Sequence, residues 1–339
     1  MHVMISDNRN KFTTMMGRIE RHFVFIFRHI TLKKIFNALL CLFERKTRRS
    51  FLHSHPFYLR IETCPYCNLH CPGCLLGGGW KEAETNPEHR KQGIMKYDLF
   101  EESVRHFLPT LFKVNLYDEG EPLLNKGIYQ MINFLSRNNV STCVSSNFSL
   151  TFSDETLEKM LDCGLEHLVV AIDGATQETY SRYRKGGDLN LIVSNLQRLL
   201  SIQNSKKKRS PLKVEIQFLD FDDNEEEREK MYQLAKQLGV WRLFIKRGCI
   251  REGWKKFTGT EEERRKRGCY ETYVSTTINS IGEMGTCDYG EDHGTPNIGF
   301  AKHYLSKELR NHPSLVHKRE SFRDKSIPLD EVCKSCCQC

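Results

Sequence analysis

The stretch that decides the fold runs from residue 57 to residue 74 and reads Phe-Tyr-Leu-Arg-Ile-Glu-Thr-Cys-Pro-Tyr-Cys-Asn-Leu-His-Cys-Pro-Gly-Cys. Its first part, 57–63, is rich in strand-forming residues and predicts a β-strand. Cys67, Cys71 and Cys74 follow on one loop, where three thiolates at this spacing can hold three irons of a [4Fe–4S] cluster. The fourth iron would then stay open to an external ligand. Cys64 adds a fourth thiol, so a structural zinc site with four cysteine ligands is the alternative.

Strand-like and helix-like segments alternate beyond this loop. The further predicted strands are 112–117, 141–145, 167–172, 212–219 and 241–246, and the helical segments between them are 97–111, 126–138, 154–163, 189–200 and 225–238. Such alternation predicts an α/β fold with a parallel sheet. Six strand–helix units are too few for a closed eight-unit barrel. They fit an open, partial (β/α)6 TIM-like barrel with its functional groups at the carboxyl ends of the strands. A flavodoxin-like sheet is the competing fold on pattern alone.

Composition excludes several classes of protein. The chain has 339 residues, of which 39% are hydrophobic and 28% charged, so it can bury a core and is not a disordered chain. No uncharged apolar run approaches the roughly 18–20 residues that span a bilayer. Residues 1–50 hold 11 Lys/Arg and 3 Asp/Glu, a net +8, which leaves 40 basic against 40 acidic residues in 51–339. A neutral body argues against a nucleic-acid partner.

The basic N-terminal arm, residues 1–55, is predicted to be a helical extension. Residues 23–43 are rich in Phe, Ile and Leu, but basic residues interrupt them and the apolar positions do not form one stripe. Two interpretations stay open: helices packed on the body, or a basic interfacial helix in peripheral contact with an anionic membrane. No cleavable signal peptide is visible, which predicts a cytoplasmic protein whose 14 cysteines serve metal binding more than disulfides.

The cysteine loop resembles the signature of the radical SAM superfamily, Cys-x3-Cys-x2-Cys after the first strand. One departure is Gly73, where the family usually has an aromatic residue. The resemblance implies that the open iron chelates S-adenosylmethionine (SAM). The reduced cluster then cleaves SAM to a 5′-deoxyadenosyl radical, which abstracts hydrogen from a substrate. It also implies an electron donor of the flavodoxin or ferredoxin type.

Two later strand ends carry further family motifs. The turn Gly120-Glu121-Pro122 resembles the Gly-Gly-Glu-Pro motif that binds the amino group of SAM, with Glu119 in place of the first glycine. Glycine there permits close approach of the backbone, and proline restricts the turn. Ser146 lies in Ser-Ser-Asn, near the family's Thr-Asn-Gly pattern.

Asp173 and Arg184 lie in a segment that resembles Asp-Gly-…-Tyr-x-x-x-Arg-x-Gly-Gly of radical SAM proteins with a C-terminal cluster domain. The resemblance implies that Asp173 bonds a ribose hydroxyl and that Arg184 pairs with the methionine carboxylate. Ordinary strand-end capping and a surface arginine are the alternatives for these two residues.

The C-terminal residues carry a second cysteine pattern. Cys269, Gly282 and Cys287 match the Cys-x9-15-Gly-x4-Cys opening of SPASM and twitch domains, and Cys333 and Cys336 follow later. The resemblance implies an auxiliary [4Fe–4S] cluster on Cys269, Cys287, Cys333 and Cys336 in a one-cluster, twitch-like module. Cys337 and Cys339 compete for the last places, and a zinc ribbon is the alternative.

Three regions and three functions are thus predicted. The regions are the extension 1–55, the partial barrel 56–250 and the cluster module 251–339. The favoured function is a radical SAM enzyme that oxidises a sugar or cyclitol alcohol, with the auxiliary cluster accepting the second electron. A peptide-modifying maturase is the alternative within this class. A zinc- or cluster-stabilised binding protein without turnover is the alternative from another class.

Overall fold

In a computed structural model of the chain, the structure describes residues 3–7, 24–74, 76, 93–206, 210–221, 224–248, 259–285, 287, 297–305 and 307–336. One sheet runs through these residues, with strand order β1-β7-β6-β5-β4-β3-β2-β8-β9-β10. Its strands are β1 (Met4–Asp7), β2 (Tyr58–Ile61), β3 (Lys113–Asn115), β4 (Ser141–Ser146), β5 (His167–Ala171), β6 (Lys213–Asp220), β7 (Arg242–Arg247), β8 (Ser275–Ile278), β9 (Glu283–Gly285) and β10 (Gly299–Phe300).

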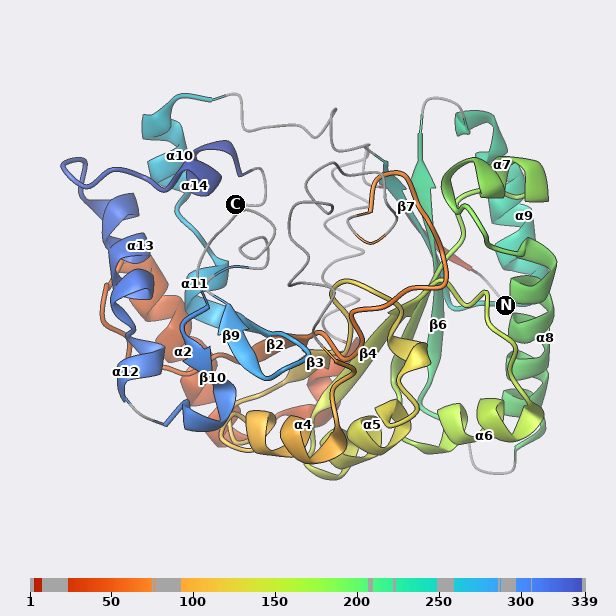
Figure 1. The fold of residues 1–339 in the computed structure, drawn as a ribbon, viewed down its shortest axis with the longest axis horizontal. Helices are drawn as coiled ribbons and strands as arrows, with labels where there is room; N and C mark the ends of the chain where they lie inside the picture. The colour runs from red at the N-terminus through yellow and green to blue at the C-terminus, as the bar shows by residue number, and fades with distance from the viewer. Residues whose placement is uncertain are drawn as a thin grey trace.

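The middle of this sheet is the predicted parallel barrel sheet. Strands β2 to β7 pair in parallel and in chain order, and they coincide with the six predicted strands. The helices that return the chain between them lie along the bottom and right of Figure 1. They are α4 (Tyr97–Val104), α5 (Ile128–Arg137), α6 (Asp154–Asp162), α7 (Gln177–Tyr183), α8 (Leu189–Ser205) and α9 (Arg228–Leu238), the last preceded by the short η5 (Glu225–Glu227). The mixed α/β fold with a parallel sheet is therefore confirmed.

Local chemistry explains where these helices start and stop. Ser153 and Asp188 accept hydrogen bonds from backbone N–H groups at the first turns of α6 and α8, which satisfies donors that a helix start leaves open. Gly239 ends α9 in the left-handed conformation that glycine adopts without strain. Serine and aspartate are residue types that typically precede a helix, and glycine is the residue that typically follows one.

Alternate residues of the barrel strands face opposite sides of the sheet. Leu59, Ile61 and Val114 belong to the large core that the sheet shares with its helices. Because successive side chains of a strand alternate in direction, their neighbours Arg60 and Asn115 face the other side. The same alternation holds on β6 and β7, where Ile216, Phe218, Leu243 and Ile245 join the core.

The N-terminal arm contributes a strand as well as helix. β1 pairs in parallel with β7 and extends the barrel sheet at that edge. Residues 8–23 lie outside the described part of the chain. A short η1 (Phe27–His29) precedes α2 (Leu32–Lys46), whose first turn is capped by the Thr31 hydroxyl. Among the described residues, no helix is both long and apolar enough to cross a membrane.

The C-terminal residues extend the same sheet at its other edge. β8 pairs in parallel with β2, and β9 and β10 follow antiparallel. Around them lie α10 (Glu261–Arg267), α11 (Glu271–Val274), η8 (Ala301–His303), α12 (Lys307–Arg310), α13 (Pro313–Arg323) and α14 (Glu331–Ser335). The predicted region 251–339 therefore shares its sheet with the predicted region 56–250.

Buried arginines replace part of the missing apolar core in this C-terminal part. Arg310 donates to the carbonyls of Ser54 (3.0 Å) and Tyr273 (2.9 Å). Arg319 donates to the Ser50 carbonyl at 2.7 Å. Buried guanidinium groups need such partners because an unpaired buried charge is costly. These bonds tie the C-terminal helices to the segment that follows α2.

Candidate functional site

The loop after β2 brings the predicted cluster ligands into mutual electrostatic reach. Burial is the main cause that raises the pKa of the Cys67 thiol to about 11, and the nearby Glu121, Cys74 and Cys71 act in the same direction. Burial also raises the pKa of Cys71, against the Arg184 guanidinium, which lowers it. A tight turn, with the Cys74 N–H donating to the Cys71 carbonyl at 3.0 Å, closes the loop. The three thiols thus share one environment at the end of β2.

Cys64 has different neighbours. It is buried, and its thiol lies 3.6 Å from the Tyr66 carbonyl oxygen. Burial raises its pKa, and the carboxylates of Glu121 and Glu62 act in the same direction. Cys64 therefore lies against the base of the loop, beside carboxylates.

The Gly120 turn packs directly on the cysteine loop. Gly120 has φ +72°, and a Cβ at this position would lie 2.1 Å from the Cys64 carbonyl oxygen. The Glu121 N–H donates to the Tyr66 carbonyl at 2.7 Å. Only glycine allows both the left-handed backbone and this approach. The end of β3 is thereby fixed against the loop that carries the three cysteines.

The side-chain oxygens of Glu121 and Ser146 accept hydrogen bonds from backbone N–H groups near the ends of β3 and β4. Glu121 accepts from the Asn147 N–H (2.8 Å) and the Leu123 N–H (3.1 Å), and the second bond starts η4 (Pro122–Leu124). Burial raises its pKa to about 7, against these hydrogen bonds, which lower it. The Ser146 hydroxyl accepts from the Phe148 N–H at 2.8 Å.

The residues after Ser146 show how the loop tolerates a departure from the family motif. Phe148 stands where the motif has glycine, and it adopts φ +57°. A bulky residue rarely takes this conformation; here Phe148 is buried and packs on Phe152, with the rings tilted by 37° and their centroids 4.9 Å apart. Asn147 donates to Asn68 (2.9 Å) and lies 3.7 Å from the Cys67 sulfur. Sequence reasoning did not assign Asn147 to the site, although its place in the Ser-Ser-Asn motif was the available signal.

Arg184 joins the end of β5 to the cysteine loop. Its Nε donates to the Asp173 carboxylate at 2.5 Å, and its Nη1 lies 3.8 Å from the Cys71 sulfur. Burial alone would lower the pKa of Arg184, but the charges of Asp173 and Cys71 raise it above its ordinary value. Burial raises the pKa of Asp173, while Arg184 and the Leu219 N–H (2.7 Å) act in the other direction. These two residues are therefore not a simple strand cap and a surface arginine.

The side of the sheet away from the helices is polar. Asn115 donates to the hydroxyls of Tyr58 and Tyr117, the latter at 2.9 Å, and Arg60 pairs with Asp118 at 3.2 Å. Sequence reasoning missed this set. The signal was the alternation of apolar and polar residues in 58–61, 113–115 and 213–218, because a fully buried parallel sheet would make these strands apolar throughout.

The donor set of this loop consists of thiolates, the ligand type that iron–sulfur clusters use. Among the described residues, no three His, Cys, Asp or Glu side chains lie close enough to hold a single ion. In a [4Fe–4S] cluster each thiolate binds a different iron, so three thiolates on one loop suit three of its four irons. Arg184, held against Cys71, supplies a positive charge beside the thiolates that such a cluster requires.

The C-terminal part assembles cysteines from distant segments. Cys269 packs on the small apolar cluster of Phe322, Leu329 and Cys333. Burial is the main cause that raises the pKa of Cys333 to about 11; Cys287 acts in the same direction, and the nearby Lys318 acts against it. Cys336 ends α14, one turn after Cys333. Cys337 and Cys339 lie outside the described residues.

Gly282 and Lys318 are two further features of this C-terminal part. Gly282 has φ +87°, and a Cβ there would lie 2.9 Å from the Leu99 side chain of α4. Packing and backbone conformation therefore both require the glycine between Cys269 and Cys287. The Lys318 amine is 2% exposed and has no hydrogen-bond partner among the described residues. Burying an ammonium without a partner is costly, and an anionic group beside Cys333 would provide that partner for Lys318.

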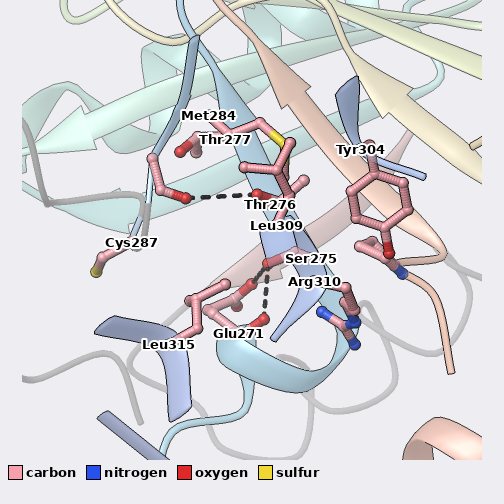
Figure 2. Close-up of a pocket in the computed structure, with 12 residues that line it drawn as sticks. Glu271, Ser275, Thr276, Thr277, Met284, Cys287, Tyr304, Leu309, Arg310 and Leu315 are labelled. Atoms are coloured by element: carbon pink, nitrogen blue, oxygen red, sulfur yellow. Dashed lines mark hydrogen bonds between the residues drawn. The ribbon is translucent and has the colours of Figure 1, made fainter. Parts of the chain in front are cut away.

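A cavity beside Cys287 is too small for a substrate. Figure 2 shows it between β8 and the following C-terminal helices, with Glu271 bonded to Ser275 and Cys287 at one side. Its volume is about 20 Å³, which is room for one water molecule.

A partial barrel with three cysteines after its first strand defines a class of enzymes that cleave SAM reductively. The Radical SAM superfamily model matches residues 61–235, and the chain belongs to this superfamily. This membership implies a [4Fe–4S] cluster and SAM as cofactors.

Curated relatives agree with the class and differ among themselves in activity. The chain is 25% identical over 200 residues to a GTP 3′,8-cyclase of Clostridium botulinum strain Hall, covering 58% of each protein. It is 24% identical over 189 residues to an AdoMet-dependent heme synthase of Methanosarcina barkeri, covering 55% of this chain and 48% of that protein. The matches thus span less than two thirds of these relatives.

The fold resembles that of Streptococcus suis SuiB in a crystal structure with bound S-adenosylmethionine. The TM-score is 0.60 at 14% identity, and the match covers 96% of this chain and 82% of SuiB. At this identity the likeness concerns the fold alone. It extends beyond the barrel into the C-terminal part of the chain.

Proposed function

We propose that this chain is a radical SAM enzyme whose cluster is held by Cys67, Cys71 and Cys74, with SAM at the open iron. The observation that carries the proposal is the Arg184 bridge. One guanidinium contacts both the Asp173 carboxylate, at the end of β5, and the Cys71 sulfur. A zinc site or a binding protein has no need for a fixed cation and a buried carboxylate at its thiolates, whereas a zwitterionic ligand such as SAM does.

The chain's own residues would then position SAM from three strand ends. The Gly120 turn offers backbone groups beside the cysteine loop, for the amino group. Arg184 presents its remaining N–H groups for the methionine carboxylate, and Asp173 keeps its orientation. Glu121 and Ser146 act on this geometry by fixing the ends of β3 and β4. When bound, the cluster would supply the electron for SAM cleavage, and a second cluster would accept one from the substrate.

We assign a second cluster to Cys269, Cys287, Cys333 and Cys336. Support comes from the buried Lys318, because a cluster with four thiolates carries net negative charge that would pair with this ammonium. Two observations support a shared site: Cys287 acts electrostatically on Cys333, and Cys269 packs on the apolar cluster that includes Cys333. This set corresponds to a twitch-like module at 251–339.

For the substrate we favour a hydroxylated small molecule, a sugar or cyclitol whose alcohol is oxidised to a carbonyl. The hydroxyl and amide groups of Tyr58, Asn115 and Tyr117, with the Arg60–Asp118 pair, suit recognition of hydroxyl groups by hydrogen bonds. Peptide modification is the second candidate, because the same groups also suit peptide amides. A flavodoxin- or ferredoxin-type protein would be the electron donor.

Anaerobic reconstitution tests the proposal. The reconstituted chain should hold iron and sulfide for about two clusters and form deoxyadenosine from SAM on reduction. Cys71→Ala should abolish deoxyadenosine formation, whereas the matched control Cys64→Ala should keep it, because Cys64 faces carboxylates. A colourless protein with zinc as its metal, or equal loss of activity in both variants, would contradict the ligand assignment. Product analysis with sugars, cyclitols and peptides then separates the two substrate classes.

A further inference from the structure

Helix α2 buries its polar face and exposes its apolar face, the reverse of an ordinary surface helix. Its residues that face the protein are Lys34, Asn37, Cys41 and Glu44, all buried. A surface helix usually buries its apolar stripe and exposes its polar face. The orientation of α2 is therefore the reverse of what burial of apolar surface alone would select.

Specific hydrogen bonds hold this orientation. The Lys34 amine donates to a backbone carbonyl just before β4 at 2.5 Å. Asn37 makes two bonds with the backbone of His55, both at 2.8 Å. Glu44 accepts from the His53 N–H at 2.7 Å and from the Ser54 hydroxyl at 2.5 Å. Because rotation of the helix would leave these buried groups unpaired, its exposed face is a built feature of the fold.

The exposed face carries an apolar stripe. Six large side chains, each 38–87% exposed, follow the spacing of one helix face: Leu32, Ile35, Phe36, Leu39, Leu42 and Phe43. The stripe is about 17 Å long, from the rise of 1.5 Å per residue. Phe27 and Phe51 extend the exposed apolar surface beyond both ends of the helix. An exposed patch of this kind marks a surface that meets a partner or a membrane.

The charges around the stripe are all of one sign. Residues 24–54 contain seven Lys/Arg and a single acidic residue, Glu44. Glu44 is fully buried, so every exposed charged side chain of this segment is basic. Arg49 lies over the Phe43 ring at 5.5 Å, which places a guanidinium at the edge of the stripe. A second copy of this chain seated on the stripe would bring two positive surfaces together, whereas an anionic surface would neutralise this one.

A cavity with six cationic side chains opens at the carboxyl end of α2. It has a volume of about 430 Å³ and shares Leu42 with the apolar stripe. The cations of this basic cavity are Arg45, Lys46, Arg48, Lys266, Arg267 and Arg319. No carboxylate is present among the described residues that line it.

The basic cavity has a fixed wall and is not the proposed cluster site. Arg48 donates to the Lys266 carbonyl at 2.6 Å, which ties the end of α2 to α10. Arg319, 1% exposed, donates to backbone carbonyls and to an amide oxygen. Of the four C-terminal cysteines assigned to a cluster, only Cys269 is among the described residues that line the cavity. The other cations of the basic cavity, among which Lys266 also pairs with Glu262 at 3.8 Å, suit the phosphate of a lipid headgroup.

We propose that α2 docks this protein on an anionic phospholipid bilayer. The apolar stripe enters the boundary between headgroups and acyl chains, and the basic cavity takes the phosphate of a lipid beside it. Apolar burial and attraction of basic residues to anionic lipids act together in interfacial helices. The proposal is independent of the radical chemistry, because none of these residues belongs to the barrel site.

Flotation with vesicles tests the proposal on the full, reconstituted chain. Vesicles of phosphatidylcholine alone are compared with vesicles of equal parts phosphatidylcholine and phosphatidylglycerol. We expect binding to the anionic vesicles, weakened by salt. Phe36→Ser with Leu39→Ser should weaken it about a hundredfold, roughly tenfold for each partly inserted side chain. The matched control, Leu305→Ser, removes an equally exposed leucine away from α2 and should leave binding unchanged.

The basic cavity is tested separately. Arg45→Gln with Lys46→Gln should weaken binding to anionic vesicles more than tenfold, at about fivefold per charge, and should reduce its salt dependence. Iron content equal to that of the unmodified chain shows that each variant is folded. Four results would each overturn the proposal: no binding to anionic vesicles, equal binding to neutral ones, a chain dimer that the stripe variants dissociate, or displacement by free glycerol phosphate at the lipid concentration used.

Discussion

Substitution of Arg184 probes the feature on which the proposed site depends. The Arg184 side chain is 16% exposed and pairs with Asp173, which is fully buried. In Arg184→Gln the Asp173 carboxylate stays buried without its cation, a change that costs about 3–5 kcal/mol in general. The Leu219 N–H still serves the other carboxylate oxygen, so we expect the lower end, a loss of about 3 kcal/mol in the free energy of unfolding.

The pH dependence of this loss has a definite sign. Burial raises the pKa of Asp173 above its value in the unfolded chain. Between these two pKa values the native protein binds more protons than the unfolded chain, so stability falls as pH rises. Without Arg184, whose charge lowers that pKa, the window extends upward. The loss in Arg184→Gln should therefore be smaller near about pH 5 than near about pH 8.

Urea unfolding of the reconstituted chain under anaerobic conditions measures both effects. The matched control is Arg182→Gln, which removes an exposed arginine of the same helix paired only with Glu178; it should cost at most about 0.5 kcal/mol. Adding Asp173→Asn to Arg184→Gln should restore most of the stability, since no buried charge then remains unpaired. The reasoning is refuted if Arg184→Gln costs no more than Arg182→Gln, or if the double variant shows no recovery.

Three further predictions test other parts of the molecule. Cys71→Ala should abolish SAM cleavage and keep the C-terminal cluster. Cys287→Ala should lose about one cluster's worth of iron and keep uncoupled SAM cleavage. Equal losses of iron and of deoxyadenosine formation in the two variants would contradict separate roles. Gly120→Ala should lower the urea midpoint far more than Gly239→Ala, because both have similar positive φ angles but only the first meets a backbone oxygen, at 2.1 Å; equal shifts would exclude the close approach as the cause. Lys318→Met should accelerate iron loss to a chelator in the reconstituted chain, because an anionic cluster would lose its buried counter-charge, and an unchanged rate would separate Lys318 from the cluster.

The order of strands and helices was predictable because each barrel unit carries a local signal. The six strands β2 to β7 are short apolar runs bounded by residues such as Gly164, Pro211 and Gly239, and their pairing follows chain order. The spacing of Cys67, Cys71 and Cys74 is likewise local, since all three lie on one loop. β1, β8, β9 and β10 were not predicted, because these short strands lie outside the alternating units and depend on the neighbours that they join.

What the sequence by itself determined is therefore the succession of elements and the three-cysteine loop. Only the tertiary structure decided which side chains meet. Arg184 reaches Cys71 across 113 residues of chain because parallel strands bring their carboxyl ends to one edge of the sheet. The apolar stripe was also hidden in the sequence, where 23–43 formed no single face, because the chain ends one helical segment near His29 and starts α2 at Leu32. Periodicity predicts that a helix has two faces, but buried hydrogen-bond partners from elsewhere in the chain decide which face is turned inward.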